Sequence, residues 1–186
     1  PIGRNAAAFQ RTLDRLVGLA VAADELGYWG LSHTEHHFHS EGMEISPDPG
    51  LYNLYLGSRT TRLHHGQLGY VVGTHDPIRL AEQCAMLDHM LQGRFFVGMA
   101  RGYQARWVGT LGQKFGAPPL SRTDPRVDDL NRKLLQEHFR IMQEAWTSDL
   151  LQYRSPHFEA PYPFEPGIEG WGPVEVTREA GVPGEV

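Results

Sequence analysis

The run Arg94-Phe-Phe-Val-Gly-Met-Ala100 decides the fold, because it is apolar after its first residue and reads as a strand buried on both faces. Strands of that kind belong to parallel sheets that are covered by helices. Arg101-Gly102 follows the run at once, so a charged side chain is expected at the carboxyl end of this strand.

The segments before this run alternate between helical and extended patterns. Asp76-Pro77 predicts a helix start with the carboxylate as N-cap, and Gly93 closes that helix. Residues 64–72 predict a strand that precedes it. Earlier still, apolar spacing predicts a helix from Phe9 that Gly27 ends, a strand at 28–31 and a short helix around 51–59.

The segments after the run read differently. A long loop is followed by a helix over about residues 129–146. From residue 147 to residue 186 prolines alternate with aromatic residues, which predicts an ordered, extended crossing segment rather than a disordered tail.

Helices and strands in this alternation predict an α/β fold with a parallel sheet and right-handed crossovers. A doubly wound nucleotide-binding sheet would usually begin with G-x-G-x-x-G, which the sequence lacks. We therefore predict a partial (β/α)8 TIM barrel. Because a whole barrel takes ~250 residues, residues 1–186 are expected to be one incomplete barrel domain, roughly the N-terminal half.

The composition favours a small-molecule ligand. The net charge is -5 and no basic block is interleaved with aromatic residues, so nucleic acid is not an expected partner. The single cysteine, Cys84, lies in a helical pattern and is interpreted as a packed core thiol in a reducing compartment. No apolar run approaches the ~20 residues of a membrane span, so we expect a cytoplasmic protein without a membrane partner.

Four histidines and a carboxylate are concentrated after the first predicted strand, in Leu31-Ser-His-Thr-Glu-His-His-Phe-His39. In parallel α/β folds the carboxyl ends of the strands are where ligands bind. His36 is the first catalytic candidate, because a neutral imidazole moves protons well near neutral pH.

Other interpretations of this cluster stay open. The histidines could be hydrogen-bonded in a loop without a chemical role. Strand alternation would form two faces, one with His33, Glu35, His37 and His39 and the other with Thr34, His36 and Phe38. A zinc or iron site is a further alternative, but ligands two apart on a strand lie ~6–7 Å apart and would need bending to share a metal, so no metal is expected.

Two further candidates lie in or after the next strands. Arg101 could bind a phosphate bidentately, with Gly102 allowing close backbone approach, and its plain alternative is a surface ion pair. Leu68-Gly69 could pack against a flat ligand, and its plain alternative is a β-bulge. All three candidates would converge on one mouth of a barrel.

The chain resembles the bacterial luciferase-like flavin monooxygenase family. The resemblance rests on an ordered set of motifs over nearly the whole chain. They are Glu35-His-His-Phe38, Gly73-Thr-His-Asp-Pro-Ile-Arg79, Leu87-Asp-His-Met90, Gly93-Arg-Phe-Phe-Val-Gly98 and Arg101-Gly102, with Ala145-Trp146, Tyr153, Pro161-Tyr-Pro163 and Thr177-Arg-Glu179 further on.

This resemblance implies a (β/α)8 barrel that binds reduced FMN, captures O2 as a C4a-peroxyflavin and oxygenates a small organic substrate such as an aldehyde. It implies a flavin reductase as the source of reduced FMN and a homo- or heterodimer. The family's first strand is then expected before residue 1 and its later strands after residue 186. A fragment of that kind would expose sheet edges and is expected to behave poorly alone.

The resemblance also implies roles for single residues. His36 matches the catalytic histidine, and Arg101 matches the arginine that holds the flavin phosphate, with Gly102 and Tyr103 beside it in the cofactor site. Leu68-Gly69 matches the pair under the isoalloxazine ring, where the family can use a non-proline cis peptide. Ala100 stands where some luciferases have a reactive cysteine, so light emission is not implied.

Two rival functions remain. A deazaflavin-dependent hydride-transfer oxidoreductase of the same superfamily would also use Arg101 for a phosphate, although Glu35-His-His37 favours FMN. A non-catalytic barrel subunit would have lost flavin chemistry, which the presence of His36 and Arg101 argues against. A flavin absorption band in the purified whole protein would decide between a flavin protein and one without flavin.

Overall fold

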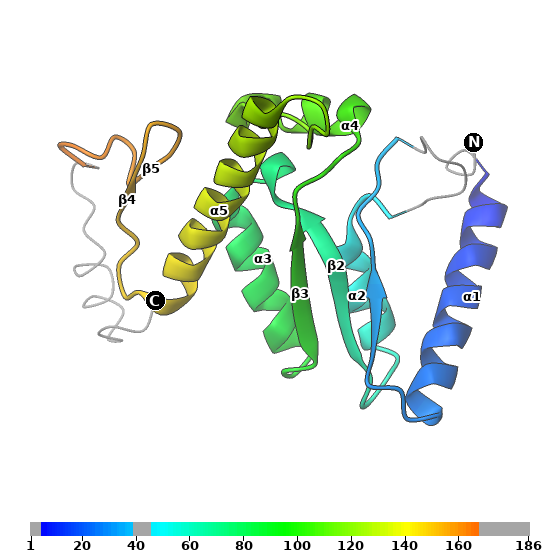
Figure 1. Cartoon of the computed structure of the whole chain (residues 1–186). Helices are drawn as coiled ribbons and strands as arrows, with labels where there is room; N and C mark the ends of the chain where they lie inside the picture. Colours follow the sequence, from blue (N-terminus) through cyan, green and yellow to red (C-terminus); the bar gives the residue numbers. More distant parts are fainter. Residues whose placement is uncertain (1–4, 39–45, 168–186) are drawn as a thin grey trace.

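A three-stranded parallel sheet forms the centre of the structure, a computed structural model that describes residues 5–38 and 46–167 (Figure 1). The strands lie side by side in chain order: β1 (Gly30–His33), β2 (His64–Val71) and β3 (Phe95–Ala100). Both neighbouring pairs are parallel. The prediction of an α/β fold with a parallel sheet is therefore confirmed.

Three helices connect and cover the strands: α1 (Ala6–Glu25), α2 (Pro49–Gly57) and α3 (Pro77–Met90). Each begins at a side-chain cap. The predicted start at Asp76-Pro77 is confirmed, because the Asp76 carboxylate accepts hydrogen bonds from the N–H groups of Ile78 and Arg79, each at 3.0 Å. Asn5 and Asp48 cap α1 and α2 in the same way.

One face of the sheet packs against these helices, and α2 lies behind the strands in Figure 1. Leu31 of β1 packs with Ala20 of α1 and Leu56 of α2. On the other flank, Tyr70 of β2 packs with Cys84 of α3. Cys84 is buried, which raises the pKa of its thiol to about 12, so the interpretation as a packed core thiol is confirmed.

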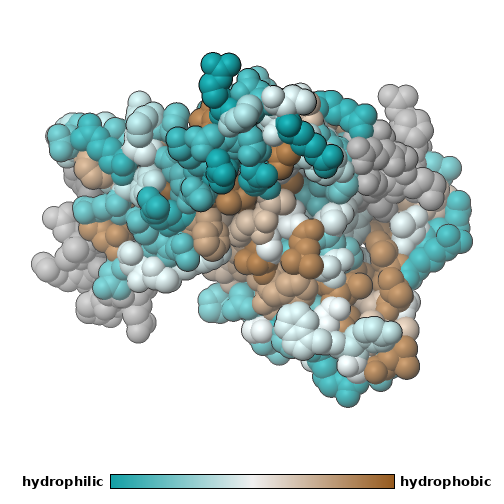
Figure 2. All heavy atoms as spheres, in the orientation of Figure 1, coloured by the Kyte–Doolittle hydropathy of each residue, from teal (hydrophilic) through white to brown (hydrophobic). Residues whose placement is uncertain are grey.

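The opposite face of the sheet is not covered by helices within residues 5–38 and 46–167. Apolar atoms gather over its middle (Figure 2). The side chain of Leu68 leaves β2 on this face and is 63% exposed. Near the start of the strands, Trp29 stacks on His64 at 4.6 Å between ring centroids and contacts Phe96 at 5.1 Å. In a closed barrel this face would point inward.

The segment after β3 departs from the predicted long loop. It contains helix α4 (Ala105–Leu111) and the 3-10 helix η3 (Gln113–Phe115). The next helix, α5 (Pro125–Thr147), begins before the predicted residue 129. Asp124 is its N-cap and Pro125 its first residue, the same start signal as Asp76-Pro77. The prediction missed this start because it followed only the apolar spacing.

After α5 the chain turns back on itself. The short strands β4 (Tyr153–Arg154) and β5 (Glu159–Ala160) pair antiparallel, so this part forms a hairpin rather than a single extended crossing. Ser155 closes the turn, because its hydroxyl accepts hydrogen bonds from the N–H groups of His157 and Phe158. The rest of the predicted crossing, residues 168–186, lies outside the described residues. None of the helices within the described ranges has the length and apolar character to cross a membrane.

Candidate active site at the carboxyl edge of the sheet

The carboxyl ends of the three strands meet at one edge of the sheet, and most of the predicted site residues lie there. Residues 34–38 follow β1, the 3-10 helix η2 (Val72–Thr74) follows β2, and Arg101 follows β3. This is the edge at which parallel α/β folds bind ligands.

His36 lies in the segment that leaves β1. Its backbone N–H donates to the carbonyl of Ser46 at 2.9 Å, and the Ser46 hydroxyl donates to the carbonyl of Thr34. These contacts join the two ends of the connection between β1 and α2. The backbone of His36 is therefore fixed, and its side chain is half-buried. His39, the last histidine of the cluster, lies outside the described residues.

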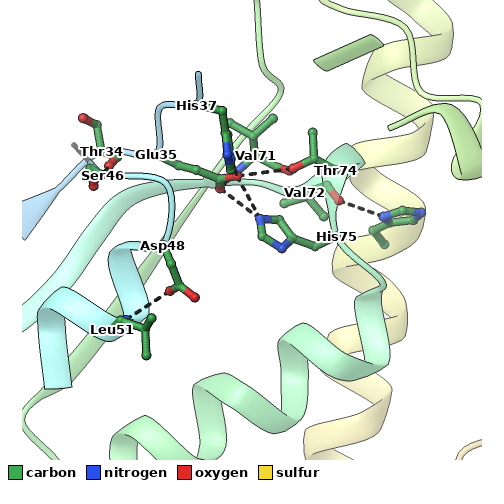
Figure 3. Close-up of polar contacts among 11 residues, drawn as sticks. Thr34, Glu35, His37, Ser46, Asp48, Leu51, Val71, Val72, Thr74 and His75 are labelled. Atoms are coloured by element: carbon green, nitrogen blue, oxygen red, sulfur yellow. Dashed lines mark hydrogen bonds and ion pairs between the residues drawn. The ribbon is translucent and has the colours of Figure 1, made fainter. Parts of the chain in front are cut away.

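Glu35 is the most heavily bonded side chain at this edge (Figure 3). Its carboxylate accepts a hydrogen bond from the Val71 N–H at 2.8 Å and one from the Thr74 hydroxyl at 3.3 Å. The Nε2 atom of His37 lies 2.7 Å from Oε1, and the Nε2 atom of His75 lies 3.0 Å from both oxygens. The segment after β1 is thereby tied to the end of β2.

Glu35 is ionised over a wide pH range. Burial by itself raises the pKa of the carboxyl, but the hydrogen bonds from His37 and His75 and the Val71 N–H outweigh burial and bring the pKa to about 2. A carboxylate that is fully removed from solvent therefore keeps its negative charge at neutral pH. That charge makes each imidazole that faces it a hydrogen-bond donor.

The predicted separation of the histidines by strand alternation holds only in part. Glu35 and His37 do share a side, where they form the contact just described. His33 is the last residue of β1 and points toward α2 instead, with its ring 5.7 Å from the ring of Tyr52. Burial lowers the pKa of His33. His33 is therefore part of the packing between β1 and α2 rather than of the Glu35 cluster.

Leu68 and Gly69 lie within β2 at an irregularity of the ladder. Leu68 is opposite Gly98 of β3 and Tyr70 is opposite Met99, so Gly69 is an extra residue between them. The plain alternative of a β-bulge is thus present. The peptide bond between Leu68 and Gly69 is cis, as the resemblance implied. The bulge leaves the Leu68 side chain standing on the uncovered face of the sheet.

Arg101 forms an ion pair at the same edge. Its Nη1 atom lies 3.0 Å from Oδ1 of Asp128, in the first turn of α5, and both side chains are about one-third exposed. The side-chain amide of Asn131 donates to the carbonyl of Arg101 at 2.9 Å and to that of Pro118 at 2.8 Å. The start of α5 is therefore fixed against the end of β3. Because a guanidinium has five N–H donors, the ion pair with Asp128 leaves donors for a second anion.

Gly102 and Tyr103 complete this corner. Gly102 has a φ of +73°, a conformation that favours glycine, and a Cβ atom there would meet the side chains of Val71 and Val108. Tyr103 is 60% exposed, and its hydroxyl accepts a hydrogen bond from the Gln104 amide at 3.1 Å. Leu68, Tyr103 and Phe38 are thus large apolar side chains that stay exposed in or after the three successive strands.

These features fit a flavin phosphate ester. A flat, apolar ring system needs an apolar surface, which the exposed side chains of Leu68 and Tyr103 offer, and its phosphate needs a cation, which Arg101 offers. Within residues 5–38 and 46–167, no group of three or more histidine, cysteine, aspartate or glutamate side chains is arranged to hold a metal ion.

Sequence reasoning missed two parts of this site. His75 was part of a recognised motif but received no role, and its contact with Glu35 joins residues 40 positions apart in the sequence. Asp128 was not considered, because the start of its helix was placed too late. The Asp124-Pro125 signal would have placed Asp128 in the first helical turn.

Comparison with known proteins identifies relatives. A model of the family described as luciferase-like monooxygenase matches residues 2–174. An uncharacterised protein of Sinorhizobium fredii, y4wF, is 35% identical over 146 residues, which are 78% of this chain and 38% of that protein. The alkanal monooxygenase beta chain of Aliivibrio fischeri is 34% identical over 93 residues, 49% of this chain and 28% of the relative.

The fold is also found in solved structures. The oxygenating constituent of 3,6-diketocamphane monooxygenase from Pseudomonas putida, a type II Baeyer–Villiger monooxygenase in complex with FMN, superimposes with a TM-score of 0.67. It is 22% identical, and the match covers 81% of this chain and 38% of that one. The chain thus spans well under half the length of these relatives, and the superposition supports the prediction of a partial barrel.

Proposed function

The chain belongs to the luciferase-like monooxygenase family, and from that premise we propose that the whole protein containing it is an FMN-dependent monooxygenase. It would use reduced FMN and O2 to oxygenate a small organic substrate. The observation that carries this proposal is the arrangement at one sheet edge of the His36 segment, the exposed Leu68 and the cation Arg101.

Each residue at this edge has a proposed task. Leu68 and Gly69 would lie against the flavin ring, since Leu68 is the large apolar side chain of β2 that reaches the uncovered face. Arg101 would bind the phosphate while keeping its contact with Asp128. Gly102 and Tyr103 would line the same corner. His36 would accept and return a proton at its imidazole beside the substrate.

The chemistry supplied by bound, reduced FMN is two electrons for the reduction of O2. One oxygen atom enters the substrate and the other leaves as water, so an aldehyde would become a carboxylic acid and the flavin would be oxidised. The protein's part is to exclude bulk water from the site and to control proton transfer there. An aldehyde is proposed because several relatives are named alkanal monooxygenases.

The partners follow from the same premise. Reduced flavin has to be delivered, so we propose a flavin reductase as the supplying partner. The alkanal monooxygenase relatives comprise alpha and beta chains, and we propose that the whole protein likewise works as a homo- or heterodimer.

Isotope labelling tests this proposal. The purified whole protein is mixed with reduced FMN, an alkanal and ¹⁸O₂, and the product is analysed by mass spectrometry. One ¹⁸O atom in the carboxylic acid is the expected result. A protein that binds a deazaflavin but not FMN, or that binds neither, would overturn the proposal in favour of the hydride-transfer or the non-catalytic alternative.

A further inference from the structure

The contacts of Glu35 exceed what holding a loop requires. Two of its partners, the Val71 N–H and the Thr74 hydroxyl, already fix the carboxylate to the end of β2. The other two are imidazoles, at 2.7 Å for His37 and 3.0 Å for His75. A buried carboxylate that holds imidazole N–H groups is the device by which proteins select a histidine tautomer and orient its ring.

The two imidazoles come from opposite sides of the carboxylate. His37 follows β1, while His75 follows η2 and contacts both carboxylate oxygens, each at 3.0 Å. A donor shared between both oxygens stabilises one rotation of the carboxylate, and that rotation leaves Oε1 available to His37 at 2.7 Å. The His75 side chain is 27% exposed and that of His37 14%, whereas the Glu35 side chain is fully removed from solvent.

His36 stands between two anchors. On one side its own N–H binds the Ser46 carbonyl at 2.9 Å. On the other side, the side chains of its two sequence neighbours, Glu35 and His37, form a hydrogen bond with each other. The backbone that carries His36 is therefore positioned by the Ser46 carbonyl and the contact between Glu35 and His37, and not by strand hydrogen bonds, since β1 ends at His33.

We propose that Glu35 is a positioning residue: its carboxylate, held by His75, orients His37 as an Nε2–H tautomer and fixes the backbone of His36 at the mouth of the site. The expected effect on turnover rests on the proposed function. The expected tautomer of His37 does not. A base that is misplaced by about 1 Å can lose on the order of 10²-fold in rate.

Three variants of the whole protein test this role. His75→Leu removes the donor, His75→Gln restores a donor nitrogen near the position of Nε2, and Glu35→Gln removes the charge. Glu82→Gln is the matched control, because Glu82 lies on the exposed side of α3, where it forms an ion pair with Arg79. Nitrogen-15 NMR of the histidine side chains reports the tautomers, and turnover and the Kd of reduced FMN are measured separately.

The wild type and the Glu82→Gln variant should show His37 as the Nε2–H tautomer. In His75→Leu and Glu35→Gln, His37 should become a mixture of tautomers. Turnover should fall roughly tenfold to a hundredfold, while the Kd of reduced FMN stays within about threefold. His75→Gln should recover most of the turnover lost in His75→Leu. Because His75 is partly exposed, its variants are informative even where Glu35→Gln fails to fold.

Several results would overturn the proposal. An Nδ1–H tautomer of His37 in the wild type would remove the orienting contact regardless of any activity. Equal turnover in His75→Leu and His75→Gln would make the donor irrelevant. If the wild type oxygenates no alkanal, the proposed function is wrong but the positioning role of Glu35 is not. The tautomer of His37 then still decides whether Glu35 orients that ring.

Discussion

His36 and His37 are adjacent in the sequence, yet the structure gives them different contacts. His37 faces the buried carboxylate of Glu35 at 2.7 Å, and its ring packs 4.9 Å from the ring of Trp107. The side chain of His36 is half-buried, and its backbone N–H donates to the carbonyl of Ser46. A histidine that is bound to a buried carboxylate is an oriented group, whereas its neighbour is the candidate for contact with the substrate.

Replacing His36 by alanine should slow oxygenation by about 10²–10⁴-fold, because a general base contributes that much to a rate. The affinity for reduced FMN should be retained, since Leu68 and Arg101 are unchanged. Steady-state turnover and an anaerobic flavin titration of the whole protein measure both quantities. The matched control is His89→Ala on the exposed side of α3, which should leave turnover unchanged. Turnover of His36→Ala within about threefold of the wild type, about 0.7 kcal/mol in barrier, would make His36 a structural residue.

The sequence was sufficient to select His36, Arg101 and Leu68 as candidates, because each lies in or after a recognisable strand. It was not sufficient to find the role of Glu35. A carboxylate within a histidine-rich run reads as one more polar residue until the fold brings His75 and the Val71 N–H to it. Contacts across about 40 residues depend on strand register, which a single sequence does not specify.

At the scale of elements, the close approach of β2 and β3 shapes the site. A Cβ atom on Gly98 would lie 2.8 Å from the side chain of Leu68 and 2.9 Å from the carbonyl of Gln67. Glycine is therefore needed at this position for the two strands to pair at their present distance.

Substituting Gly98 by alanine should destabilise the whole protein by about 1–3 kcal/mol, as overpacking does, and should displace Leu68. Thermal unfolding measures the loss as a lower Tm. Gly18→Ala in α1 serves as the control, because a Cβ atom there meets nothing within 4 Å. Alanine should raise stability at that position by up to about 1 kcal/mol through helix propensity. A Gly98→Ala protein as stable as the wild type would contradict this account of the β2–β3 contact.

The layer between β2 and α2 contains a titratable group. His65 is fully buried, and its Nε2 atom lies 2.8 Å from the Thr60 hydroxyl. Burial, together with the nearby positive charge of Arg94, lowers the pKa of His65 from 6.5 to about 4. His65 is therefore protonated less readily in the folded state than in the unfolded state.

This difference predicts an acid-sensitive stability. The contribution of neutral His65 is fully present above pH 6.5 and is lost as the pH falls from 6.5 toward 4, by up to about 3 kcal/mol. His65→Gln cannot gain this charge, so its Tm should fall less than that of the wild type between pH 7 and pH 5. His89→Gln on the surface should behave as the wild type does. Equal pH dependence in His65→Gln and the wild type would show that His65 does not limit acid stability.

Element boundaries could be predicted wherever caps and apolar spacing agreed. Both signals place the start of α3 at Asp76-Pro77, and the structure agrees. For α5 only the spacing was followed, so the helix start was placed four residues late, at Asp129 instead of Pro125. Helix α4 was missed because Ala105–Leu111 is short and lacks a side-chain cap hydrogen bond.

At the scale of the whole molecule, the sheet is one-sided. Helices α1, α2 and α3 connect and cover the strands on one face, while the face with Leu68 is apolar and is not covered by described helices (Figure 2). A sheet of this kind closes into a barrel when further strands continue it. The match to the diketocamphane monooxygenase covers only 38% of that protein, which agrees with a partial barrel. That residues 1–186 form one incomplete domain stays a prediction.

The most direct test of a flavin site at this sheet edge is an anaerobic titration of the whole protein with reduced FMN. The wild type should bind it saturably, and Arg101→Ala should raise the Kd by roughly one to two decades, because a charge-assisted phosphate contact is worth ~1.5–3 kcal/mol. Asp128→Asn, which removes the partner but keeps the cation, should bind at least as tightly as the wild type. Arg79→Ala on the surface of α3 is the control and should leave the Kd unchanged. Absence of saturable binding, or an Arg101→Ala protein with the Kd of the wild type, would contradict a flavin site at this edge.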